Sequence, residues 1–62
     1  MPKYPDITVK LVGTDGNAYS VLGKVCSALR KAGKPTDAFL MEATSGDYND
    51  LLNTAMEYVN VE

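Results

Sequence analysis

The sequence predicts a small α+β domain in which one strand precedes three helices and a short strand follows them. Three observations support this prediction: a length of 62 residues, one stretch near the N-terminus that alternates apolar and polar residues, and later stretches with apolar residues every three or four positions. Alternation indicates a half-buried strand, whereas the longer period indicates amphipathic helices. A chain of this length has room for a single domain, residues 1–62, of which we expect residues 1–5 to be flexible.

The first predicted element is a strand over residues 7–12, which read ITVKLV. Its apolar residues Ile7, Val9 and Leu11 would share one side, and β-branched residues of the kind found here favour strands. The following residues 13–16, which contain two glycines, predict a turn.

A long helix is predicted after this turn, beginning after Asn17 and ending before Gly33. Asparagine is a preferred N-cap because its side-chain oxygen accepts a hydrogen bond from a free backbone N–H of the first turn. Glycine after the last apolar position, followed shortly by proline, is typical of a helix end. The apolar positions at helical spacing are Ala18, Val21, Leu22, Val25, Leu29 and Ala32.

A short helix is predicted from about Pro35 or Thr36 to Thr44, and a third helix begins after Asp47. The expected core contacts of the short helix are Ala38, Phe39, Met41 and Ala43. Those of the third helix are Tyr48, Leu51, Leu52, Ala55, Met56 and Val59. Asp47 and Asp50 would cap the third helix and place negative charge at the positive end of its dipole.

Residues 59–61 (VNV) alternate again and predict a short C-terminal strand. A single strand would leave its backbone N–H and C=O groups unpaired. We therefore expect either these C-terminal residues or a second copy of the chain to complete a two-stranded sheet with the first strand.

The composition argues against several classes of function. The sequence has no histidine and one cysteine, Cys26, so it offers no imidazole base, no Cys/His zinc set and no disulfide within the chain. We expect Cys26 to pack as a small hydrophobe. No apolar run approaches the roughly 20 residues of a membrane helix, and the N-terminal residues do not resemble a signal peptide. The prediction is a cytoplasmic, non-enzymatic protein without a cofactor, a metal or a membrane segment.

Charge is segregated along the chain, whose net charge is −2. Residues 1–34 hold six basic and two acidic side chains, hence +4, whereas residues 35–62 hold six acidic and no basic ones, hence −6. Either the two halves fold against each other and neutralise locally, or they present opposite faces that steer partners or drive head-to-tail association. The basic residues are Lys3, Lys10, Lys24, Arg30, Lys31 and Lys34.

The polar side of the first predicted helix is the candidate interaction surface. Glycine inside a helix costs about 1 kcal/mol relative to alanine, so Gly23 suggests a close approach by another backbone or a ligand. Gly23 and Ser27 would form a shallow groove, and tyrosine and arginine are favoured in interfaces. We predict a partner-binding or self-association face at Tyr19, Gly23, Ser27 and Arg30. The alternative is that Gly23 packs against the short second helix.

Several stretches resemble a known group of proteins. They are DGNA (15–18), LG (22–23), ALRKAG (28–33), EATSGDY (42–48) and LL (51–52). On these residues the chain resembles, from about position 7 to 61, a group of short uncharacterised proteins of bacterial and bacteriophage genomes. The resemblance implies a prophage or mobile-element context and a small accessory binder, with no catalytic residues. Tyr19 and Tyr58 stand where the group has phenylalanine and tryptophan, which are conservative departures.

These observations predict a protein-interaction or accessory module of prophage or mobile-element type. The alternative is a small nucleic-acid-binding module that uses the basic side of the first helix, at Lys24, Arg30, Lys31 and Lys34. Phosphate contacts would make such binding fall steeply with salt. The net negative charge and the acidic second half of the chain argue against this alternative.

Overall fold

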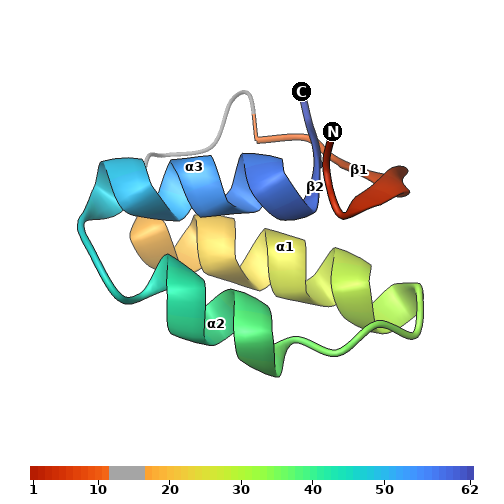
Figure 1. Ribbon diagram of the computed structural model, residues 1–62, viewed down its shortest axis with the longest axis horizontal. Helices are drawn as coiled ribbons and strands as arrows, with labels where there is room; N and C mark the ends of the chain where they lie inside the picture. Colours follow the sequence, from red (N-terminus) through yellow and green to blue (C-terminus); the bar gives the residue numbers. More distant parts are fainter. Residues whose placement is uncertain (12–16) are drawn as a thin grey trace.

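The computed structural model describes residues 1–11 and 17–62, which form five elements in the order β1–α1–α2–α3–β2 (Figure 1). Their bounds are Tyr4–Val9 for β1, Ala18–Lys31 for α1, Asp37–Ala43 for α2, Tyr48–Tyr58 for α3 and Val59–Val61 for β2. The predicted α+β class and element order are confirmed. None of these helices has the length and apolar character needed to cross a membrane in the described part of the chain.

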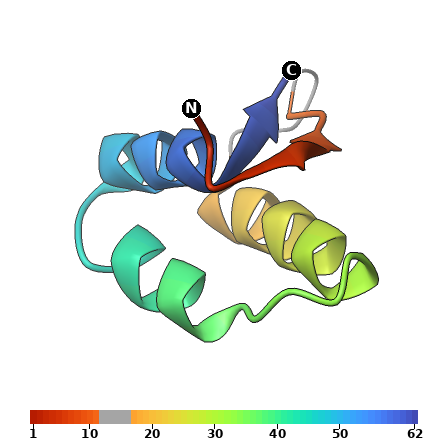
Figure 2. The same ribbon diagram turned by 45° about the vertical axis from the view of Figure 1, so that its right-hand side comes forward.

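The two strands form a parallel sheet, so the residues at the C-terminal end of the chain complete the sheet as predicted. Backbone hydrogen bonds continue the pairing beyond the strands, from Leu11 N to Glu62 O at 2.7 Å and from Glu62 N to Val9 O at 3.0 Å. The paired residues are Tyr4 with Val59, Thr8 with Asn60 and Val9 with Val61, and the register is irregular between Tyr4 and Thr8. The C-terminal strand consequently lies beside the N-terminal strand (Figures 1 and 2).

The predicted position of the first strand was wrong by three residues. β1 begins at Tyr4 rather than Ile7 and therefore includes two of the residues expected to be flexible. Pro5 has no N–H for a ladder, but its carbonyl oxygen accepts a hydrogen bond from Asn60 Nδ2 at 2.6 Å, and proline is tolerated at a sheet edge. Lys3 N also donates to Glu57 O at 2.7 Å. The predicted end of the strand at Val12 and the turn at residues 13–16 lie outside the described residues.

The caps predicted for α1 set its bounds. Asn17 Oδ1 accepts a hydrogen bond from Tyr19 N at 2.8 Å. At the other end Gly33 has φ +74°, in the left-handed region that favours glycine, and Lys34 N donates to Leu29 O at 2.8 Å. These local interactions explain why the sequence pattern located this helix to within a residue.

Asp47 and Asp50 form a capping box at the start of α3. Asp50 N donates to Asp47 Oδ1 at 3.0 Å, and Asp47 N donates to Asp50 Oδ2 at 3.2 Å. Two orphan N–H groups of the helix end are thereby satisfied. A Cβ added to Gly46 would collide with the Asp50 side chain, so glycine at this position leaves room for the box.

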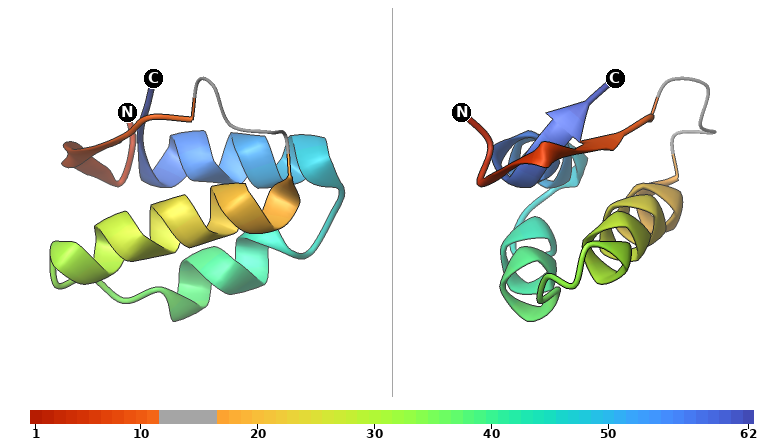
Figure 3. Two further views of the ribbon diagram at one scale, coloured as in Figure 1. Left: turned by 180° about the vertical axis from the view of Figure 1, so that it is seen from behind. Right: turned by 90° about the vertical axis from the view of Figure 1, so that its right-hand side faces the viewer.

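The core lies between the three helices and the sheet, and α2 covers the side far from the strands (Figures 2 and 3). Phe39 and Tyr58 pack edge to face with ring centroids 5.4 Å apart, and Tyr4 lies 6.2 Å from Tyr58. These rings join α2, α3 and β1. The buried hydrophobic residues are Val9, Val21, Val25, Cys26, Leu29, Phe39, Ala43, Leu51, Ala55, Tyr58 and Val59.

Some predicted core contacts are exposed. Ala32, Ala38, Met41, Tyr48 and Met56 point outward. The seven-residue α2 buries one face through Phe39 and Ala43, which leaves the other side of this helix in solvent.

Candidate functional site

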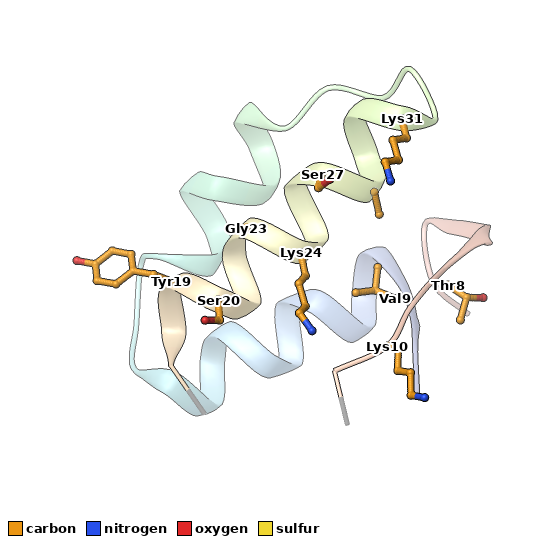
Figure 4. Close-up of a pocket in the computed structure, with 10 residues that line it drawn as sticks. Thr8, Val9, Lys10, Tyr19, Ser20, Gly23, Lys24, Ser27 and Lys31 are labelled. Atoms are coloured by element: carbon orange, nitrogen blue, oxygen red, sulfur yellow. The ribbon is translucent and has the colours of Figure 1, made fainter. Parts of the chain in front are cut away.

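An open groove of about 660 Å³ lies between β1 and α1, and most of the predicted site residues meet there (Figure 4). We call it the β1–α1 groove. It is lined by Thr8, Val9 and Lys10 from the β1 side and by Tyr19, Ser20, Gly23, Lys24, Ser27, Ala28 and Lys31 from α1.

The helical period of α1 directs two sets of side chains to two sides of the helix. Val21, Val25 and Leu29 recur every four residues and are buried in the core. A polar set, offset around the helix, lines the groove and consists of Ser20, Lys24, Ser27 and Lys31. Lys24 and Lys31 extend from α1 on the side where β1 lies, and the Tyr19 ring projects away at the far end (Figure 4). The same helix therefore anchors the fold and presents a cationic wall.

The groove is positively charged although the whole protein is negative. Lys10, Lys24 and Lys31 line it, and none of the described residues that line it is acidic. No lysine or arginine forms an ion pair within 4.0 Å with a carboxylate in residues 1–11 and 17–62. The local neutralisation considered from the sequence is therefore not found as direct ion pairs in this part of the chain. Uncompensated positive charge on a concave surface concentrates anions near that surface.

Gly23 forms part of the groove wall and is exposed. A Cβ placed on Gly23 would meet no atom of a neighbouring element within 4 Å in the described structure. The alternative prediction, in which Gly23 packs against the short second helix, is therefore wrong. The missing side chain instead leaves open space beside Ser27 in the groove wall.

The structure brings together three of the four residues predicted to bind a partner. Tyr19, Gly23 and Ser27 line the groove, and Tyr19 is 83% exposed. Arg30 is exposed but is not among the groove residues; its charge acts on the Cys26 thiol instead.

The residues predicted for nucleic-acid binding are likewise divided. Lys24 and Lys31 line the groove, whereas Arg30 and Lys34 do not. The Lys34 Nζ atom lies 5.5 Å from the centre of the Tyr4 ring, where cation and ring attract each other. The predicted basic side of the helix is therefore not one continuous surface of the groove.

Sequence reasoning missed Thr8 and Lys10 as site residues. The alternation of the first strand placed both residues on its polar side, and this was the one signal in the sequence that could have identified them. Their position beside α1 depends on the tertiary packing of β1 against α1, and residues 10–17 separate these two elements in sequence.

Two buried groups away from the groove have a raised pKa. Burial raises the pKa of the Cys26 thiol, and the positive charge of Arg30 opposes this effect in part. Cys26 is 5% exposed and packs in the core, in the manner expected of a small hydrophobe. A hydrogen bond between the side chains of Tyr58 and Glu42, aided by burial, raises the pKa of Tyr58 to about 12.

The described residues include no cluster of three or more His, Cys, Asp or Glu side chains that could hold a metal ion. The polar groups that line the groove are ammonium groups, hydroxyl groups and backbone groups. No protein-family model, curated protein or solved structure matches the chain.

Proposed function

We propose that this chain is a non-enzymatic protein-interaction module that binds an anionic partner in the β1–α1 groove. The observation that carries the proposal is the lining of the groove: three lysines and four hydroxyl side chains without an acidic residue among the described ones, in a protein of net charge −2. Such a surface steers an acidic partner to one face and repels basic ones. The prophage or mobile-element context and the cytoplasmic location stay predictions.

The hydroxyl groups of the groove support binding rather than catalysis. A serine nucleophile needs a base within hydrogen-bonding reach. No hydrogen bond joins Ser20 or Ser27 to a lysine in the described part of the chain. The one thiol, Cys26, is buried in the core and its raised pKa disfavours the reactive thiolate.

Nucleic-acid binding is the second candidate. The exposed Tyr19 ring at the end of the groove favours it, because an unpacked aromatic ring is a platform on which a base can stack. The acidic residues of α2 and α3 and the overall negative charge would repel a long polyanion, which favours a short acidic protein segment.

A titration with two anionic probes tests the proposal. A penta-glutamate peptide and a ten-nucleotide oligothymidine are added to labelled protein, and backbone amide shifts and affinities are measured at low and at physiological salt. We expect the peptide to shift residues of β1 and α1 around the groove and to bind more tightly than the oligonucleotide. Tighter binding of the oligonucleotide would favour the second candidate.

Two charge-matched double variants provide the control. Lys24→Gln with Lys31→Gln removes two positive charges from the groove, whereas Arg30→Gln with Lys34→Gln removes two from outside it. The proposal expects the first pair to abolish peptide binding and the second to leave most of it. Equal losses in both would mean that net charge, not the groove, attracts the peptide.

A further inference from the structure

We propose that the partner of the β1–α1 groove is an extended acidic segment of another protein, which adds to the free edge of β1 as a strand. This inference rests on the proposed function, since it names the kind of partner that the same groove takes. Three features of the structure lead to it: an unpaired strand edge, a helix wall beside that edge, and the positions of the lysines.

The first feature is the free edge of β1. β1 has one strand neighbour, β2, in the described sheet. Lys10 directly follows β1 and continues its edge. Glu62 forms hydrogen bonds with Val9 O and Leu11 N, the groups on either side of Lys10, so the N–H and C=O of Lys10 face away from β2. Neither of these two groups forms a hydrogen bond in the described structure. Unpaired groups on a strand edge are a template for another extended chain.

The second feature is the position of this edge beside α1. Thr8, Val9 and Lys10 form one wall of the groove and α1 forms the other (Figure 4). A peptide that enters such a groove pairs its backbone with the strand and places alternate side chains against the helix. In this binding mode the backbone bonds supply affinity, while the wall selects the side chains.

The third feature is the spacing of the lysines on α1. Lys24 and Lys31 are seven residues apart, which corresponds to about 10 Å along a helix that rises 1.5 Å per residue. Alternate residues of a strand are about 6.7 Å apart, so three acidic side chains at alternate positions span roughly 13 Å and reach both lysines. The segment that fits has acidic residues at every second position.

Charge also argues against a second copy of this chain as the occupant. Pairing of two β1 edges across a two-fold axis would bring two sets of Lys10, Lys24 and Lys31 together, and like charges facing each other oppose association. An acidic segment of a different protein meets the same surface with the opposite sign.

Backbone methylation of a peptide provides the test. The probe is acetyl-Glu-Val-Glu-Val-Glu-amide, compared with two N-methylated forms, one methylated at the odd positions and one at the even positions. All three carry the same charges, but each methylated form can pair through one edge only. Strand addition predicts that one methylated form binds about tenfold or more weakly and that the other keeps its affinity. It also predicts that the Lys10 amide exchanges more slowly when the unmodified peptide is bound.

The other outcomes separate this inference from the proposed function. Equal affinity of all three peptides, abolished by Lys24→Gln with Lys31→Gln, would overturn strand addition and leave the groove as an anion-binding surface. Failure of all three to bind would overturn both. A stable dimer in which the Lys10 amide is protected without peptide would also overturn the inference, because a second copy would then cover the edge.

Discussion

Replacement of Gly23 by alanine should stabilise the protein. Gly23 lies inside α1, its φ is not positive, and an added Cβ meets no neighbouring element within 4 Å. Gly23→Ala should therefore raise the free energy of unfolding by the full difference in helix propensity, about 0.8–1.0 kcal/mol, without a steric cost. For a domain of this size, such a gain raises the Tm by about 4–8 °C.

Thermal and urea unfolding followed by circular dichroism measure this effect, and Gly33→Ala is the matched control. Gly33 has φ +74° at the end of α1, where a side chain is strained at a cost of about 1–2 kcal/mol. We expect the two substitutions to shift the Tm in opposite directions. Because Gly23 lines the groove, Gly23→Leu should additionally weaken peptide binding while the fold persists.

A neutral or destabilising Gly23→Ala would refute this reasoning. It would mean that another molecule approaches the α1 backbone closely in solution, as the glycine inside the helix first suggested. Sedimentation over a wide protein range would then show whether that contact is a second copy.

The remaining predictions concern the core, a cap and a buried hydroxyl. Phe39 is fully buried, so Phe39→Ala should lower the free energy of unfolding by about 3–5 kcal/mol, which is enough to unfold much of so small a domain. Circular dichroism should show this loss of structure, whereas Phe39→Leu should stay folded. Asp47→Ala should lower the free energy of unfolding, measured with urea, by about 1 kcal/mol, and Asp47→Asn should lower it little because asparagine still caps the helix. The pKa of Tyr58 is about 12 in the folded protein and near 10 when unfolded, so its contribution to stability is complete below pH 10 and is lost as pH rises from 10 to 12. Urea unfolding across this range should show a smaller decline in Tyr58→Phe, and an unchanged decline would contradict the assignment.

The sequence predicted the parts of the fold that depend on local signals. Asn17 and Gly33 bound α1 because caps act within one turn, and Val21 and Leu29 are buried as their spacing predicted. Tyr58 was not predicted to be in the core. It lies seven residues after Leu51 and three after Ala55, so the helical period that places those two residues in the core also includes Tyr58.

The candidate site was predictable as far as it lies on one helix. Tyr19, Gly23 and Ser27 share a side of α1 by spacing alone, and this side proved open. The contribution of Thr8 and Lys10 was not predictable, since the position of β1 beside α1 depends on packing between elements. Arg30 was predicted to belong to the binding face because it flanks the same side of α1. Its position around the helix axis places it outside the groove lining.

The parallel pairing of β1 with β2 has a consequence for the order of folding. Asn60 bonds to Pro5 across a separation of 55 residues, so the chain must close a long loop before the sheet forms. Helices form in about a microsecond and their local contacts can precede this closure. Since β1 is one wall of the groove, the binding surface is assembled late, and a transient opening of the two strands would remove it while the helices persist.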